Sequence, residues 1–288
     1  MNKQGNNGIG WCTHTWNPCT GCYNQCSYCY AKKIAERFSV EHSKPLPRAG
    51  IDICAPNDNR SDTILFYNRT KDAFPVGFDP TLYFHRLDEP AKLKKPANIF
   101  VCSMADLFGD WIPDEWIEAV FDACRKAPQH NYLFLTKNPE RYKEIPLDVK
   151  VRKNYWFGST LTNSTDKWYG GNIWYPFTDM ENSRVKTFVS YEPILERHVP
   201  DSIISDSIFL NAINWLIFGL ETPVKKDNPF QWTWIEDLVK EAIEQGIPIY
   251  VKPSLKDKIP DEYYLQQFPE GLRRKGEAYN RSMSNKRR

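Results

Sequence analysis

Short apolar runs recur along the chain and alternate with segments of helical periodicity. Most of the runs are continuous stretches of aromatic and β-branched residues with few charges, such as Ile99-Phe100-Val101-Cys102. Runs of this kind are typical of strands that are buried on both faces of a parallel sheet. Seven strands are predicted in this way, over residues 11–16, 98–103, 131–136, 155–160, 185–190, 214–219 and 247–252. Residues 81–85 form one further short candidate.

Between several of these runs, apolar residues spaced three and four positions apart predict amphipathic helices. Pro113 suits the first position of a helix, and the apolar residues from Trp116 to Cys124 then fall on one face. Further helices are predicted over residues 233–245 and, directly after a cluster of cysteines, over residues 29–38. Because strands and helices alternate, we predict an α/β fold with right-handed βαβ units, as a sheet or a barrel.

One long stretch, residues 43–80, does not follow this pattern. It is rich in Pro, Asn, Asp and Arg and has little periodicity, which predicts an irregular insertion. Long loops of this kind in compact folds are often functional. We therefore expect a barrel domain over residues 1–253 that contains this insertion, and a C-terminal extension over residues 254–288.

Composition and charge narrow the class of protein. The chain has 288 residues, of which 41% are hydrophobic, and this is enough for a single α/β barrel. Its net charge of +2 argues against strong polyanion binding by the whole molecule. Residues 271–288 differ, because seven Lys or Arg against one Glu give them a net charge of +6. Such a tail either frays in solvent or contacts phosphate groups.

Residues 1–10 are polar, and no apolar run approaches the length of a membrane span, so we expect a cytoplasmic protein with no membrane partner. Eight cysteines in such a chain indicate metal binding or catalysis rather than disulfides. Three scattered cysteines, Cys54, Cys102 and Cys124, are expected to be small buried hydrophobic residues.

The remaining chemistry is concentrated in a short cysteine-rich segment. Cys22, Cys26 and Cys29 form a C-x3-C-x2-C motif with an aromatic residue, Tyr28, before the last cysteine. Three thiolates this close together can bind three irons of a [4Fe–4S] cluster and leave the fourth iron open to a substrate or cofactor.

Two other metal sites compete with this interpretation. Two residues separate Cys19 from Cys22, so the segment also contains two C-x2-C pairs that could hold zinc. Zinc sites usually separate such pairs by about a dozen residues, whereas only three residues separate them here. A ferredoxin-like cluster would need Cys19 or Cys12 as a fourth ligand, and its usual spacing differs. The roles of Cys12 and Cys19 stay open.

The motif from Cys22 to Cys29 resembles the signature of the radical S-adenosylmethionine (SAM) superfamily, in which the cysteine loop follows the first barrel strand and leads into the first helix. Further segments resemble an uncharacterised, phage-associated family, the Gp37/Gp68-like DUF5131 family. They are Thr15-Trp16-Asn17-Pro18, Ser103-Met104-Ala105-Asp106-Leu107-Phe108, Leu135-Thr136-Lys137-Asn138-Pro139-Glu140-Arg141, Val189-Ser190-Tyr191-Glu192-Pro193 and Gly219-Leu220-Glu221-Thr222. Together these segments span about residues 11–252.

The resemblance implies a partial or full (βα) barrel of the radical SAM type, with about six core parallel strands and one or two extra strands. It also implies a [4Fe–4S] cluster on Cys22, Cys26 and Cys29, at which SAM is cleaved reductively to a 5′-deoxyadenosyl radical. The chemistry requires a reductant such as flavodoxin or ferredoxin. No residue is identified as catalytic toward the substrate.

Candidate SAM-binding residues lie just past the predicted strands, where barrels carry their functional groups. The superfamily often places a Gly-Gly-Glu-like turn after the second strand, and Asp106 occupies the place of that glutamate as an acceptor for the SAM ammonium. The alternative is that Ser103 and Asp106 cap the following turn. Tyr28 corresponds to the aromatic residue beside the adenine. The other candidates are Ser103, Lys137, Ser159, Glu192 and Glu221.

Two questions stay open at this point. Glu192, Glu221 and Lys252 all follow strands, and a Glu–Lys ion pair that closes the barrel is the alternative to SAM binding. The basic tail and the abundant aromatic residues suggest a nucleic acid or nucleotide substrate, which would be modified or repaired. From a different class, a non-catalytic Fe–S or zinc protein that binds nucleic acid is the alternative function.

Overall fold

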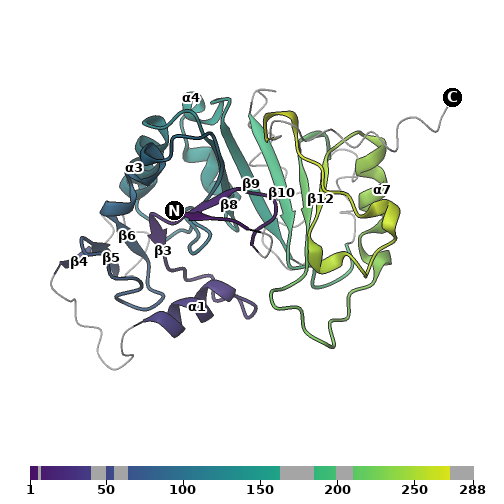
Figure 1. Cartoon of the computed structure of the whole chain (residues 1–288), viewed down its shortest axis with the longest axis horizontal. Helices are drawn as coiled ribbons and strands as arrows, with labels where there is room; N and C mark the ends of the chain where they lie inside the picture. The colour runs from purple at the N-terminus through teal and green to yellow at the C-terminus, as the bar shows by residue number, and fades with distance from the viewer. Residues whose placement is uncertain (6–7, 40–49, 55–63, 163–184, 199–209, 273–288) are drawn as a thin grey trace. The chain divides into compact units, whose positions relative to one another are not determined.

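A computed structural model of the chain describes residues 1–5, 8–39, 50–54, 64–162, 185–198 and 210–272 (Figure 1). The chain divides into two compact units, Met1–Ser159 and Thr160–Arg288, and the division falls within one strand, β9. Both units contain parallel strands that coincide with the apolar runs of the sequence. The predicted α/β class, with a mostly parallel sheet, is therefore confirmed.

In the first unit, one short strand pairs antiparallel at the edge of a set of parallel strands. In spatial order they are β1 (Asn2–Lys3), β2 (His14–Trp16), β7 (Asn98–Val101), β8 (Asn131–Thr136) and β9 (Tyr155–Leu161). The register aligns Thr15 with Phe100 and Phe100 with Leu133. All four residues of β7 are buried, which explains why Ile99, Phe100 and Val101 follow one another without alternation of polar and apolar residues.

The second unit contains the parallel strands β10 (Lys186–Tyr191), β11 (Leu216–Phe218) and β12 (Ile249–Val251). Helix α7 (Glu236–Glu244) lies beside β12, as Figure 1 shows, and buries its apolar face of Leu238, Val239 and Ala242. The sequence predicts this helix from residue 233, but a short 3₁₀ turn precedes its first α-helical residue.

Four further α-helices lie in the first unit. They are α1 (Tyr30–Phe38), α2 (Glu89–Lys92), α3 (Asp114–Arg125) and α4 (Leu147–Lys150). Short 3₁₀ helices are η1 (Phe84–Arg86), η2 (Pro139–Glu144), η3 (Trp232–Trp234), η4 (Pro253–Leu255), η5 (Asp261–Tyr263) and η6 (Glu270–Leu272). Pro113 precedes α3 in an extended conformation, so it caps the helix and is not its first helical residue.

A second, four-stranded sheet differs from the sequence-based expectation. Its order is β3 (Cys19–Thr20), β6 (Thr81–Tyr83), β5 (Leu65–Asn68) and β4 (Ile51–Cys54), and Figure 1 shows β4, β5 and β6 side by side. Strands β4 and β5 lie in residues 43–80, where the sequence predicts an irregular insertion. Each of these strands has only four residues, too few for a clear period, and pairing with β6 organises them.

Within the described residues, no helix combines the length and the apolar composition needed to cross a bilayer. Cys102 and Cys124 are buried, as predicted, whereas the burial of the Cys54 side chain is outside the description. Of the basic tail, residues 273–288 also lie outside the described residues.

Candidate functional site

The cysteine loop, residues 22–29, begins where two backbone segments lie in close contact. Gly21 has a φ of +88°, and a Cβ atom at this position would lie 2.3 Å from the carbonyl oxygen of Asp79. The N–H of Gly21 donates to the carbonyl of Met104 at 2.9 Å, which ties the start of the loop to the segment after β7. Because both the conformation and the space admit only glycine, the loop starts from a fixed position.

The loop ends at the first turn of α1. Cys29 is the N-cap residue, and its Sγ accepts a hydrogen bond from the N–H of Lys32 at 3.3 Å. The N–H of Cys29 donates to the carbonyl of Cys26 at 3.1 Å. Between the cysteines, Gln25 has a φ of +52°, a left-handed conformation that is strained for a residue with a side chain.

The three thiols of the motif are partly exposed and are not in disulfides. Burial raises the pKa of the Cys22 thiol to about 12, and the charges of Asp106, Cys26 and Cys29 add to this effect. No three His, Cys, Asp or Glu side chains are grouped as metal ligands in the part of the chain that the structure describes. Three thiols in one loop are nevertheless the donor set of a [4Fe–4S] cluster, so the residues fit such a cluster in number and kind.

Cys12 and Cys19 differ from these three thiols because both are buried. Cys19 lies in β3, where burial and a hydrogen bond with Cys102 raise the pKa of its thiol. The thiol of Cys12 donates to the carbonyl of Ile9 at 3.7 Å. A zinc site built from two C-x2-C pairs would therefore require Cys19 to leave the interior.

Asp106 lies in the segment after β7, and its buried carboxylate accepts four hydrogen bonds. Oδ1 accepts from the hydroxyl of Thr136 at 2.6 Å and from the N–H of Phe108 at 3.2 Å. Oδ2 accepts from the side-chain amide of Asn24 at 3.0 Å and from the N–H of Lys137 at 2.9 Å. An ionised carboxylate has about four acceptor positions, so these donors occupy its hydrogen-bonding capacity.

Ser103 contacts the segments on both sides of the cysteine loop. Its hydroxyl donates to Oδ1 of Asn17 at 3.1 Å, and the same oxygen accepts from the N–H of Met104 at 3.1 Å. The hydroxyl of Tyr30, the first residue of α1, donates to the carbonyl of Ser103 at 2.7 Å. The segment after β7 is thus hydrogen-bonded both before and after the cysteines.

Lys137 lies beside the cysteine loop as well, directly after the last residue of β8. Its Nζ is 5.3 Å from the centre of the Tyr28 ring, within the range of a cation–π interaction. With the hydrogen bond from its N–H to Asp106, this contact brings the loop after β8 against the cysteine loop at two points.

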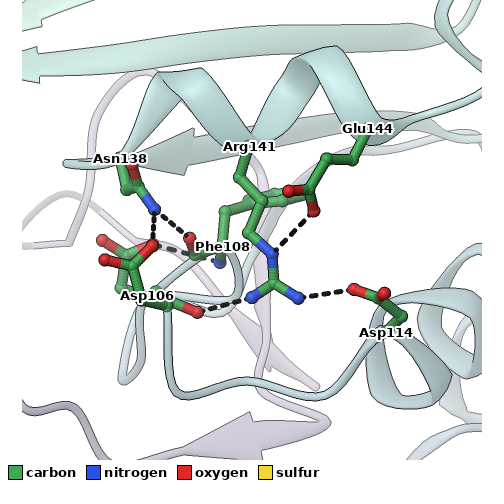
Figure 2. Close-up of polar contacts among 8 residues, drawn as sticks. Asp106, Phe108, Asp114, Asn138, Arg141 and Glu144 are labelled. Carbon is green, nitrogen blue, oxygen red and sulfur yellow. Dashed lines mark hydrogen bonds and ion pairs between the residues drawn. The ribbon is translucent and has the colours of Figure 1, made fainter. Parts of the chain in front are cut away.

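The loops after β7 and β8 are also joined to each other on the side shown in Figure 2. The amide of Asn138 donates to the carbonyl of Phe108 at 3.0 Å and to Asp110 at 2.6 Å. The buried guanidinium of Arg141 donates to the carbonyl of Gly109 and to Asp114, both at 2.6 Å. It also donates to Glu144 at 3.3 Å.

Ser159 is fully buried, and within the part of the chain that the structure describes its hydroxyl has no hydrogen-bond partner. The register of the parallel strands pairs it with Thr136, so the two side chains project from the same face of the sheet. A buried hydroxyl without a partner is costly, and such groups call for an explanation such as an unseen ligand or water.

Glu192 and Glu221 belong to the second unit. Glu192 forms an ion pair with Lys252, which is the alternative that the sequence left open. The buried carboxylate of Glu221 lies 3.2 Å from Nζ of the exposed Lys225. Both carboxylates therefore have a cationic partner within their own unit.

The structure brings together the predicted site residues of the first unit in neighbouring segments. They are Cys22, Cys26, Tyr28, Cys29, Ser103, Asp106 and Lys137. Sequence reasoning did not identify Asn17, Asn24 or Asn138 as residues that hold these segments. Asn17 and Asn138 occur in the segments that resemble a known family, whereas no sequence signal distinguishes Asn24.

Comparison with known proteins gives one extensive match. A family model with the description "Protein of unknown function (DUF5131)" matches residues 6–256. No curated protein sequence matches the chain.

Two solved structures of spore photoproduct lyase are similar to this chain. The structure "complexed with dinucleoside spore photoproduct" has 11% sequence identity and a TM-score of 0.48, and the match covers 82% of this chain and 75% of that chain. A mutant of the lyase with the same ligand has 12% identity and a TM-score of 0.47, at the same coverage. At these values neither likeness establishes a shared fold or reaction.

Proposed function

The chain belongs to the DUF5131 family, whose function is described as unknown, and from this premise we propose that it is a radical SAM enzyme. One observation carries the proposal. A loop with three partly exposed cysteines comes after β2, the first parallel strand of its sheet, with only the two-residue strand β3 between them. It leads into α1, which Cys29 caps. We further propose that the parallel strands belong to a partial or full (βα) barrel of the radical SAM type.

In this proposal Cys22, Cys26 and Cys29 hold a [4Fe–4S] cluster and leave one iron free of protein ligands. A cluster of this kind, with SAM bound, supplies the electron that cleaves SAM reductively. The chain's own residues bind and orient SAM and exclude water from the site. The high pKa of Cys22 means that iron must displace a tightly held proton from this thiol.

We infer the SAM contacts in the first unit from the exposure of the side chains and from their hydrogen-bond partners. The ammonium of Lys137 lies beside the ring of Tyr28. The carboxylate of SAM can pair with this ammonium, and the adenine of SAM can stack on the ring. The Ser103 hydroxyl can still accept a hydrogen bond, and the Ser159 hydroxyl has no partner among the described residues. A SAM ammonium at Asp106 would have to displace one of its four donors.

Glu192 and Glu221 are the proposed SAM-binding residues of the second unit. Each carboxylate pairs with one lysine, Lys252 or Lys225, and has further acceptor positions for hydroxyl or ammonium groups. Replacing Glu192 by Gln should weaken SAM binding if this role is correct. Unchanged SAM affinity would assign Glu192 to the ion pair alone.

Anaerobic reconstitution of the full chain tests the proposed function. We expect iron uptake, an EPR spectrum of the reduced cluster that shifts on addition of SAM, and release of 5′-deoxyadenosine. Cys26→Ala should lose iron, whereas the matched variant Cys19→Ala should keep it because Cys19 is buried away from solvent. Tetrahedral zinc without iron uptake would refute the enzyme and favour a zinc protein that binds nucleic acid.

We propose a nucleic acid or nucleotide as the substrate, and flavodoxin or ferredoxin as the class of reductant. The support for this substrate is the net charge of +6 in residues 271–288. Removal of these residues should sharply weaken nucleic-acid binding at low salt, measured by fluorescence anisotropy with a labelled oligonucleotide. Equal binding by the full and the shortened chain would contradict the proposed role of the tail.

A further inference from the structure

The cysteine loop contains a strained residue next to its most specific contact. Gln25 has a φ of +52°, in a region that side chains rarely occupy, so other contacts must hold this conformation. The residue before it, Asn24, donates its side-chain amide to Oδ2 of Asp106 at 3.0 Å. Asn24 lies midway between Cys22 and Cys26, so this hydrogen bond acts on the part of the loop that separates two proposed iron ligands.

Asp106 is suited to hold the loop because three other donors fix the position of its carboxylate. The hydroxyl of Thr136, the last residue of β8, donates to it, as do the N–H groups of Phe108 and Lys137 in the segments after β7 and β8. Only 6% of Asp106 is exposed, and hydrogen bonds to a buried carboxylate are about twice as strong as those between neutral groups. Asn24 adds the single donor that comes from the cysteine loop.

We propose that Asp106 is a positioning residue. Through its hydrogen bond with Asn24, it holds the cysteine loop in a fixed position against the loops after β7 and β8. This role replaces direct contact of Asp106 with SAM, because its four acceptor positions are already used. The effect on a bound cluster rests on the function proposed above, whereas the effect on the loop itself does not.

Hydrogen–deuterium exchange on the full chain without metal measures the loop directly. Asn24→Ala removes the contact from an exposed side chain, so the fold should persist. We expect the bonded amides of residues 22–29 to exchange about tenfold faster, which corresponds to about 1.4 kcal/mol at 25 °C. The N–H of Lys137 should keep its protection, because Asp106 still accepts it.

Two further variants separate positioning from general destabilisation. In Asp106→Asn, the new amide presents either a donor or a weaker acceptor to the Asn24 side chain and to the N–H of Lys137. The backbone amides of both segments should therefore exchange faster. Asn138→Ala is the matched control, because its amide joins Phe108 and Asp110 but does not contact Asp106. This control should loosen the loop after β8 and leave residues 22–29 protected. If Asp106→Asn does not fold, Asn24→Ala decides alone.

The reconstituted protein gives a second readout. At equal iron content, Asn24→Ala should shift the EPR spectrum or the midpoint potential of the cluster relative to wild type, and Asn138→Ala should not. Unchanged exchange of residues 22–29 in Asn24→Ala would overturn the proposal, as would a shift of equal size in the control. If wild type binds no iron, the proposed function fails, while the exchange experiment still decides whether Asp106 positions the loop.

Discussion

Replacement of Gly21 by Ala is the most direct test of how the cysteine loop is supported. A Cβ atom at this position would lie 2.3 Å from the carbonyl oxygen and 2.4 Å from the carbonyl carbon of Asp79. These are backbone atoms, so the overlap cannot be relieved by rotation of a flexible side chain. The φ of +88° adds a second cost, because it is unfavourable for any residue with a Cβ atom.

The two costs can be separated. A non-glycine residue in the left-handed region costs about 1–2 kcal/mol, and overpacking against fixed neighbours costs about a further 1–3 kcal/mol. Gly21→Ala should therefore lower the free energy of unfolding by about 3 kcal/mol. Gly77→Ala is the matched control in the same unit, because Gly77 has a φ of +67° and open space around the Cβ position. It should cost only about 1–2 kcal/mol.

Urea unfolding, followed by tryptophan fluorescence and circular dichroism on both variants, measures these free energies. The comparison of interest is the difference between Gly21→Ala and Gly77→Ala, which isolates the overlap with Asp79. If the two variants are equally stable, Asp79 moves aside at no cost and the argument for a rigid start of the cysteine loop fails.

Two other outcomes follow from buried groups in the first unit. Arg141→Lys keeps the charge but loses the planar donors to Gly109, Asp114 and Glu144. It should lower the free energy of unfolding, measured in urea, by about 2–3 kcal/mol. The control Lys143→Ala removes an exposed ion pair and should lower it by about 0.5 kcal/mol or less. A cost for Arg141→Lys as small as that of the control would contradict this. In the metal-free chain, a raised pKa of about 12 leaves Cys22 largely protonated at pH 8, so mass spectrometry should show far slower alkylation by iodoacetamide than at pH 11. The same shift means that native stability falls as pH rises from about 9 towards 12. Fast alkylation of Cys22 at pH 8 would show that the pKa of this thiol is not raised.

The sequence predicts the parallel strands well because each is a continuous buried run, as in Ile99 and Phe100 of β7. It does not predict the second sheet, since β4 and β5 are four-residue strands whose order depends on pairing with β6. Boundaries shift for a similar reason. Pro113 marks the start of a helix in the sequence, but only its extended backbone conformation shows that it lies one residue before the first helical position.

For the candidate site, spacing alone indicates the three cysteines, because their donor chemistry is local in sequence. The partners of Asp106 are not local. Asn24 is 82 residues away and Lys137 is 31 residues away, so only the folded chain shows that the carboxylate is fully bonded. An aspartate after a strand has the same appearance in a sequence whether it binds a ligand or holds a loop.

The end of the segment that the sequence predicts as an insertion contacts the start of the cysteine loop. Phe78 accepts a hydrogen bond from the N–H of Cys22 at 3.2 Å, and the backbone of Asp79 adjoins Gly21. The hydroxyl of Tyr23 donates to Asp79 at 3.2 Å. A shortened chain without residues 43–80 would thus lack the contacts that support the start of the cysteine loop. Substitutions at Phe78 or Asp79, far from the cysteine motif in the sequence, are therefore expected to disturb the proposed cluster site.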